Sequence, residues 1–168
     1  MGVAPLAGPA EPHFIEVGVG AVAFGEAPDT LMTPALGSCV GVAVWDPARF
    51  AGGLAHVMLP EPCDSVEGDL DRFASYAVPL LADTLHRGGS ARRRLVAKIA
   101  GGAAMFAADT MLCSIGRRNV DAVKHQLALL RIPVVAEDTG GGHARTLELH
   151  LDSGLLVVRS YQFGLKEL

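Results

Sequence analysis

The sequence has few cysteines and few charges, and each shortage excludes a class of protein. Three cysteines in 168 residues are too few for a disulfide scaffold, and no CxxC pair points to a structural zinc site. Charged residues make up 19% of the chain and hydrophobic residues 50%. A disordered chain needs the opposite balance, so we expect one folded domain that buries roughly 70% of its unfolded surface.

Long apolar runs and an excess of positive charge are also lacking. The longest stretch without a formal charge, residues 30–45, contains Pro34 and Gly37 and is shorter than the roughly 20 apolar residues of a spanning helix. A secretory leader would require positive charge near its start, but no lysine or arginine precedes Arg49. The net charge of −4 argues against a general nucleic-acid binder. We therefore expect a cytoplasmic protein with no nucleic-acid partner and no membrane insertion.

Two charged clusters are interpreted as exposed loops on either side of a predicted helix. Whether they face charged partners stays open at this stage. The basic cluster is Arg87, Arg92, Arg93, Arg94 and Lys98, and the acidic cluster is Glu61, Asp64, Glu67, Asp69 and Asp71.

Hydrophobic periodicity predicts an α+β domain, a mixed α/β layered sandwich over residues 13–168, after a loose tail at residues 1–12. Apolar residues at helical spacing predict a helix over 70–87, with a kink or late start at Pro79, and a second helix beginning near Asn119, a good N-cap residue. These two main helices should pack on a mixed or antiparallel sheet of six or more strands. Strands are predicted at 14–24, 40–45, 54–59, 95–100, 132–136, 145–151 and 155–160.

The chemistry is most clearly indicated around Cys39. Gly37 and Ser38 precede it and allow the chain to turn sharply before an apolar run, where backbone N–H groups could hold an oxyanion. A cysteine nucleophile needs a base, and His56, 17 residues later in another apolar run, is the leading candidate. The alternatives are a small buried hydrophobe for Cys39 and a hydrogen-bonded core residue for His56.

Other candidate sites are weaker. The spacing of Cys39, His56 and Cys63 gives little support to a metal site, and Cys63 and Cys113 are interpreted as inert. The glycines at 101–102 and 140–142 match no phosphate-binding pattern. We interpret both glycine segments as turns, with a pocket-lining role as the alternative.

Several motifs in order resemble the chemoreceptor glutamine deamidase family, CheD. They are Leu36-Gly-Ser-Cys-Val40, Gly53-Leu-Ala-His-Val-Met-Leu-Pro60, Ala97-Lys-Ile-Ala-Gly-Gly-Ala103 with Met105-Phe106, Ile115-Gly-Arg-Arg-Asn119, and Glu137-Asp-Thr-Gly-Gly141 with Ala144-Arg145. The resemblance covers roughly residues 14–160. It implies a layered fold similar to that of deamidating bacterial toxins.

The resemblance also implies an activity. Members hydrolyse chosen glutamine side chains on the cytoplasmic domains of chemoreceptors to glutamate and release ammonia, and some hydrolyse glutamate methyl esters. The family nucleophile corresponds to Cys39, its histidine to His56, and a threonine that orients the histidine to Thr33. Gly37 and Ser38 would support the oxyanion. This predicts a cysteine-dependent protein-glutamine glutaminase that needs no metal and no cofactor.

One departure and two alternatives accompany the resemblance. Ala35 stands where glycine is more usual, which questions the loop geometry rather than the chemistry. Thr33 precedes Pro34, so its backbone should be extended, and either its hydroxyl or its carbonyl could face His56. The alternative function is a non-catalytic partner that activates the CheC phosphatase, and a protease or transferase has no supporting motif. A monomer is the default expectation.

Overall fold

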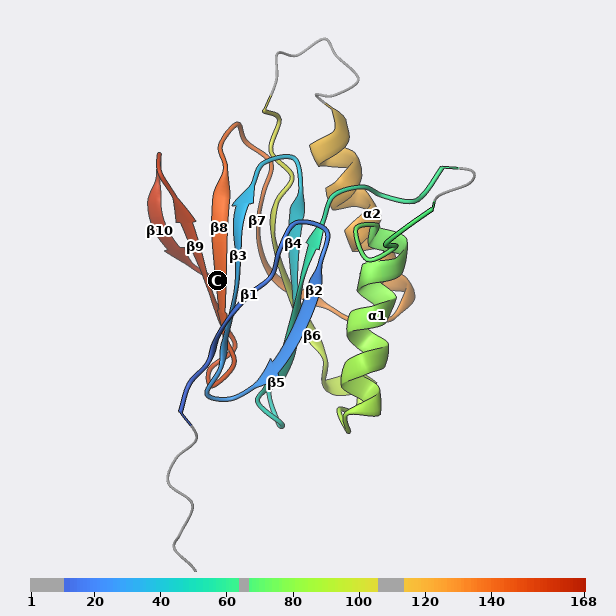
Figure 1. Ribbon diagram of the computed structural model, residues 1–168, viewed down its shortest axis with the longest axis vertical. Coiled ribbons are helices and arrows are strands. Elements are labelled where there is room, and N and C mark those ends of the chain that lie inside the picture. The colour runs from blue at the N-terminus through green and yellow to red at the C-terminus, as the bar shows by residue number, and fades with distance from the viewer. Residues whose placement is uncertain (1–10, 64–66, 106–113) are drawn as a thin grey trace, which may run out of the picture.

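The computed structural model describes residues 11–63, 67–105 and 114–168. The tail expected at residues 1–12 lies almost wholly outside them, as do Asp64 and Cys113. Within these residues the chain forms two five-stranded sheets and two main helices, stacked as sheet, sheet and helices (Figure 1). The predicted α+β class is confirmed. The strands are divided between two sheets, where the sequence predicted one sheet of six or more.

The first sheet has the order β1-β3-β8-β9-β10 and is antiparallel except for the β1–β3 pair. Two of its strands were not predicted: β3, which contains Pro34, and the short, exposed β10. Its strands are β1 (Phe14–Glu16), β3 (Thr30–Leu36), β8 (Arg145–His150), β9 (Leu155–Ser160) and β10 (Gly164–Glu167).

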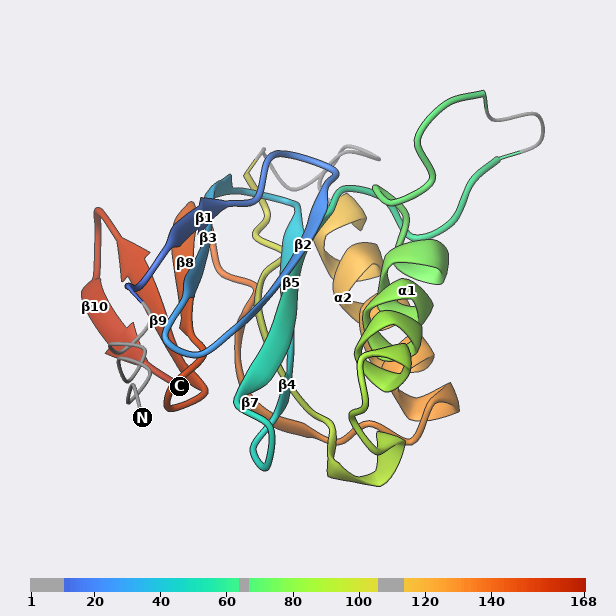
Figure 2. The same cartoon turned by 60° about the horizontal axis from the view of Figure 1, so that its bottom comes forward.

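The second sheet has the order β2-β5-β4-β6-β7, with β6 and β7 parallel and the other pairs antiparallel. It lies between the first sheet and the helices, so both of its faces are buried (Figure 2). Its strands are β2 (Val22–Glu26), β4 (Val40–Asp46), β5 (Ala51–Val57), β6 (Val96–Gly101) and β7 (Val134–Thr139). The single strand predicted over 14–24 is two strands, one in each sheet.

Two hydrophobic cores follow from the alternation of side chains along the second sheet. Val40, Val42 and Val44 of β4 face the helices, whereas Ala43 of the same strand and Leu54 of β5 face the first sheet. Each of these residues is at most 2% exposed. The near-continuous apolar runs read from the sequence are therefore strands that are buried on both faces.

The helices start at different residues from those predicted. Helix α1 (Ala74–Arg87) begins four residues after the predicted start, because the carbonyl of Arg72 accepts the N–H groups of Met58 and Leu59. That pairing places the preceding residues alongside the chain after β5. Pro79 lies inside the helix, so the expected alternative of a start at Pro79 is wrong. Helix α2 (Ile115–Leu129) begins four residues before Asn119. The predicted N-cap is wrong, and Asn119 is a fully buried residue inside the helix.

The basic cluster is only partly solvated. Residues Arg92–Arg94 form a short 3-10 helix, and Arg94 donates from Nε and Nη2 to the buried carboxylate of Asp46 at 3.0 and 2.8 Å. Asp46 also accepts the N–H of Ala48. These hydrogen bonds, chiefly those from Arg94, lower the pKa of Asp46 to about 2. The Arg94–Asp46 ion pair connects the end of β4 to the chain that leads into β6.

We expect Asp46→Asn to lower the free energy of unfolding by about 2 kcal/mol at neutral pH, because buried hydrogen bonds to a charged group are lost. The pKa of Asp46 in the folded state lies below its ordinary value of 3.8. The contribution of Asp46 to the free energy of unfolding is therefore complete above pH 3.8 and is lost as the pH falls towards about 2. The free energy of unfolding, measured with urea from neutral to acidic pH, should fall less steeply with acid in Asp46→Asn than in the wild-type protein.

The matched control for this prediction is Asp121→Asn, which breaks an exposed pair with Arg117 at 3.8 Å. Asp121→Asn should change the free energy of unfolding by less than about 0.5 kcal/mol at every pH. Equal losses in the two variants would contradict the role given to Asp46.

Candidate active site

Cys39 and His56 lie on one face of two paired strands. Cys39 directly precedes β4, and His56 lies in β5 opposite Gly41. Cys39 and Gly41 are two residues apart, so the thiol and the imidazole occupy diagonal positions on the face that meets the first sheet. The contact of Cys39 with the core between the sheets confirms this placement. His56 is 1% exposed, whereas Cys39 is half-buried at the strand end.

Gly41 allows the first sheet to close over this site. A Cβ atom at residue 41 would clash with the side chain of Leu147 in β8 and would lie 3.0 Å from Cδ1 of Leu36. Both leucines are fully buried beside the site. Any larger residue opposite His56 would therefore push the two sheets apart.

Thr33 determines which nitrogen of His56 carries the proton. The Thr33 hydroxyl donates to the carbonyl of Val17 at 2.8 Å, and the same oxygen lies 2.8 Å from Nδ1 of His56. Because the hydroxyl proton is already used, the oxygen accepts from Nδ1–H, which leaves the lone pair on Nε2. The hydroxyl, rather than the backbone carbonyl, is thus the group of Thr33 that faces His56.

The second nitrogen of His56 is available for chemistry. Nε2 is buried and has no hydrogen-bond partner among the described residues. A core histidine with only a structural role would be expected to pair both nitrogens. Burial lowers the pKa of His56 below its ordinary value of 6.5. The imidazole is therefore neutral at neutral pH and can accept a proton.

Burial has the opposite effect on the thiol. Desolvation raises the pKa of Cys39 above its ordinary value of 9.0, although its own backbone N–H partly offsets this. The resting site therefore holds a neutral thiol beside a neutral imidazole rather than a preformed ion pair. A nucleophilic role for this thiol would require its proton to pass from sulfur to nitrogen during the attack.

The nucleophile loop, residues 37–39 before β4, is fixed by hydrogen bonds that its carbonyl groups accept from other segments. The carbonyl of Gly37 accepts the N–H of Ala103 at 2.9 Å, and that of Cys39 accepts the N–H of Gly102 at 2.8 Å. The carbonyl of Ser38 accepts from the side chain of Asn119 at 3.0 Å. In residues 11–63, 67–105 and 114–168, no other residue accepts a hydrogen bond from the N–H groups of Ser38 and Cys39, and the N–H of Cys39 interacts with its own thiol. An oxyanion role for these N–H groups stays a prediction.

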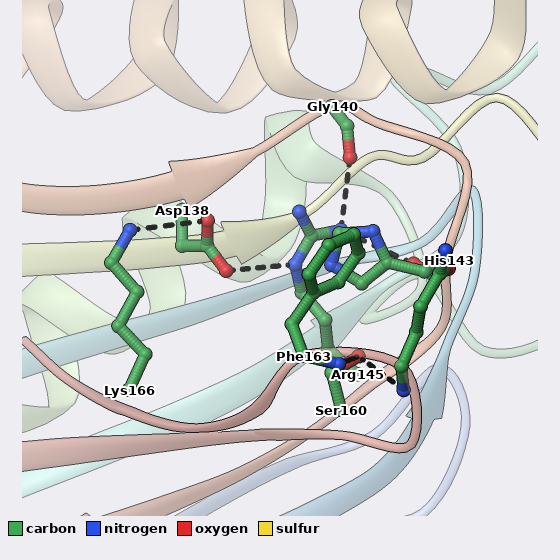
Figure 3. Close-up of polar contacts among 8 residues, drawn as sticks. Asp138, Gly140, His143, Arg145, Ser160, Phe163 and Lys166 are labelled. Atoms are coloured by element: carbon green, nitrogen blue, oxygen red, sulfur yellow. Dashed lines mark hydrogen bonds and ion pairs between the residues drawn. The ribbon is translucent and has the colours of Figure 1, made fainter.

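A buried arginine lies behind this loop. Arg145 is 3% exposed and pairs in register with Leu36, the last residue of β3. It donates to Asp138 at 3.0 Å and to the carbonyls of Gly140 and His143 at 2.9 and 3.2 Å (Figure 3). Nζ of Lys166 in β10 donates to the other carboxylate oxygen of Asp138.

The two glycine segments of the sequence meet in this region. The N–H of Gly140 donates to the carbonyl of Gly101, and the N–H of Ala104 donates to that of Gly141. Arg145 therefore supports the 140–143 loop, which contacts the segment after β6, and that segment holds the carbonyls of Gly37 and Cys39. The sequence motifs contained Arg145, but its spacing carried no signal for this role.

Ala35 adopts the conformation that explains why glycine would be expected there. Its φ is 57°, in the left-handed region, at the bulge where β3 shifts register against β8. An L-residue in that region costs roughly 1–2 kcal/mol. The alanine is therefore accommodated at this bulge in a conformation that glycine would adopt at lower cost.

Two further sequence interpretations concern metal and membrane. The part of the chain that the structure describes has no group of three His, Cys, Asp or Glu residues placed to hold a metal ion. Cys63 is exposed in the segment after β5 and does not join Cys39 and His56 in such a group. Neither α1 nor α2, nor any other described helix, has the length and apolar character that a membrane crossing requires.

Comparison with known proteins gives the family. A family model described as CheD chemotactic sensory transduction matches residues 58–160. The probable chemoreceptor glutamine deamidase CheD 2 of Geobacter metallireducens is 43% identical over 158 residues, 92% of this chain and 98% of the relative. The chain belongs to the CheD family. The resemblance drawn from its motifs is confirmed.

Other CheD relatives span nearly the same length. The probable chemoreceptor glutamine deamidase CheD of Methanococcus vannielii is 42% identical over 145 residues, 86% of this chain and 94% of the relative. CheD 3 of Geobacter sulfurreducens is 41% identical over 160 residues, 93% of this chain and 99% of the relative. Among solved structures, the Bacillus licheniformis hypothetical protein YfiH aligns with a TM-score of 0.44 at 16% identity, over 70% of this chain and 49% of that one.

The Thr33–His56 hydrogen bond can be tested through stability alone. We expect Thr33→Val to lower the free energy of unfolding by about 1–3 kcal/mol, because Nδ1–H of His56 would lose its acceptor in a buried position. Thr33→Ser keeps the hydroxyl and should recover most of this loss. Urea unfolding of the three proteins measures the difference. Equal stability of the valine and serine variants would contradict the hydrogen bond.

Proposed function

We propose that this chain hydrolyses glutamine side chains on the cytoplasmic domains of chemoreceptors to glutamate and ammonia, with Cys39 as nucleophile, His56 as acid and base, and Thr33 as the residue that orients His56. The names of the CheD relatives support the reaction. The observation that carries the assignment to these residues is the unpartnered Nε2 of a buried neutral imidazole on the same sheet face as the thiol.

The first half of the reaction forms a thioester. Nε2 of His56 takes the proton of the Cys39 thiol as sulfur attacks the side-chain carbonyl carbon of the glutamine. The negative charge that develops on oxygen is stabilised by the N–H groups of Ser38 and Cys39, with Gly37 supporting the loop. His56 then returns the proton to the amide nitrogen. The carbon–nitrogen bond breaks, and ammonia leaves.

The second half restores the enzyme. His56 takes a proton from a water molecule as the water oxygen attacks the thioester carbon. The carbon–sulfur bond then breaks, and His56 returns the proton to sulfur, which gives glutamate and the free thiol of Cys39. A glutamate methyl ester can follow the same course with methanol as the leaving group. No step requires a metal or an organic cofactor. We propose a cytoplasmic enzyme, because the receptor domains it would modify are cytoplasmic, and we keep a monomer as the default expectation.

The alternative function is a non-catalytic activator of the CheC phosphatase. An activator would use an exposed surface and would have no need of the buried lone pair on Nε2. Activity on receptor peptides therefore discriminates the two functions.

Incubation of a receptor cytoplasmic fragment with this protein should raise the mass of chosen glutamine peptides by about 1 Da, because NH2 is replaced by OH. Cys39→Ala should abolish the shift and leave the melting temperature nearly unchanged. Cys63→Ala, at the exposed cysteine, is the matched control and should keep full activity. Deamidation by the Cys39→Ala protein would overturn the mechanism. Capture of CheC without any mass shift would favour the activator.

The resting protonation state gives a separate prediction. The ultraviolet absorbance of the Cys39 thiolate, measured against Cys39→Ala, should rise with a midpoint above 9.0, because burial raises the pKa of the thiol. The acid limb of kcat/KM should have its midpoint below pH 6.5, because burial lowers the pKa of His56 and protonation removes the base. A thiolate band at neutral pH would instead show a preformed ion pair.

A further inference from the structure

Asn119 joins the two parts of the candidate active site. Its Nδ2 donates to the carbonyl of Ser38 at 3.0 Å and to the carbonyl of Met58 at 2.8 Å. Ser38 directly precedes Cys39, and Met58 lies two residues after His56. Asn119 is fully buried in the second turn of α2. One side chain thus contacts the backbone next to the proposed nucleophile and the backbone next to the proposed base.

The contacts define the orientation of the amide. Both neighbours of the assigned nitrogen are carbonyl oxygens, which only accept hydrogen bonds, so the NH2 group must face them. The amide oxygen Oδ1 is buried and has no partner among the described residues. Asparagine is also a weak helix former. Local stability of the helix therefore does not explain asparagine at this position, and an explanation has to come from its two contacts.

The approach of α2 to the site depends on Gly116, one turn before Asn119. A Cβ atom at residue 116 would lie 2.6 Å from the carbonyl oxygen of Gly102 and 2.5 Å from that of Ala103. These two residues hold the carbonyls of Cys39 and Gly37. The first turn of α2 therefore packs directly on the segment that supports the nucleophile loop, and this brings Asn119 within reach of Ser38.

We propose that Asn119 is a positioning residue that fixes the Cys39 loop against the end of β5 and so sets the distance and direction between the thiol and Nε2 of His56. This inference rests on the proposed function, since it concerns the same thiol and imidazole. Asn119 touches neither group. It acts through the backbone of Ser38 and Met58. Its contact with the Ser38 carbonyl also orients the N–H of Cys39, which belongs to the same planar peptide group.

The test is a double-mutant cycle read by alkylation of Cys39, which needs no receptor. Iodoacetamide is the probe, and peptide mapping separates Cys39 from the other cysteines. Asn119→Asp keeps the shape of the side chain but replaces the donor with a carboxylate oxygen facing two carbonyls. Asn119→Ala removes the donor without adding charge. Each is combined with His56→Gln, and all variants are measured well below their melting temperatures.

His56→Gln should slow alkylation of Cys39 in the wild-type background, because the base is lost. In either Asn119 variant, His56→Gln should have little further effect on the alkylation rate, because the imidazole is no longer positioned to take the proton of the thiol. The Asn119 variants should also lower kcat for deamidation by roughly 10- to 100-fold and change KM little. Val123→Ala, at a buried residue one turn further along α2, is the matched control. It should leave the alkylation rate and its dependence on His56 unchanged.

The outcomes separate the two proposals. If His56→Gln leaves alkylation unchanged in wild-type protein, the proposed Cys39–His56 mechanism fails. If His56 matters and its effect persists fully in the Asn119 variants, the inference about Asn119 is overturned and the mechanism stands. Loss of folding in both Asn119 variants, with Val123→Ala folded, would assign Asn119 to stability and would also overturn the inference.

Discussion

The pairing of β4 with β5 is the constraint on which the rest of this structure depends. Its register places Gly41 opposite His56 and leaves Cys39 at the strand end on the same face. The two strands are central in the second sheet, with helices on one face and the first sheet on the other. This sandwiching removes water from the imidazole and from much of the thiol. The lowered pKa of His56 and the raised pKa of Cys39 are consequences of that position.

The interior that desolvates His56 also supplies its partner. Thr33 comes from the first sheet, and its hydroxyl links the carbonyl of Val17 to Nδ1 of His56 across the space between the sheets. One nitrogen of the imidazole is satisfied and the other is left unpaired. A buried polar atom without a partner opposes folding by about 1–3 kcal/mol. We infer that this cost is retained because a free lone pair on Nε2 is what a general base requires.

The parts of the site that lie in one local segment could be predicted from the sequence, and the parts that depend on long-range contacts could not. Cys39 and His56 are in apolar runs whose lengths indicate adjacent strands, and motif order assigned the family. Asn119 was misplaced as a helix cap, because nothing in its own segment shows that Ser38 and Met58, each more than 60 residues away, need donors. Arg145 carried no signal for a different reason: two of its acceptors are backbone carbonyls only five and two residues away, and no residue type in the sequence marks such an acceptor.

The nucleophile loop shows how distant contacts can determine a conformation that local preferences oppose. Ala35 adopts a φ of 57°, which an alanine on its own disfavours. Three successive carbonyls after it, at Gly37, Ser38 and Cys39, are fixed by donors from the segment after β6 and from α2. Once the carbonyls are held on that side, the intervening N–H groups face the other way. Under the proposed mechanism, a substrate carbonyl that approaches the half-buried thiol would meet N–H donors that the packing of α2 and the 101–104 segment has already oriented.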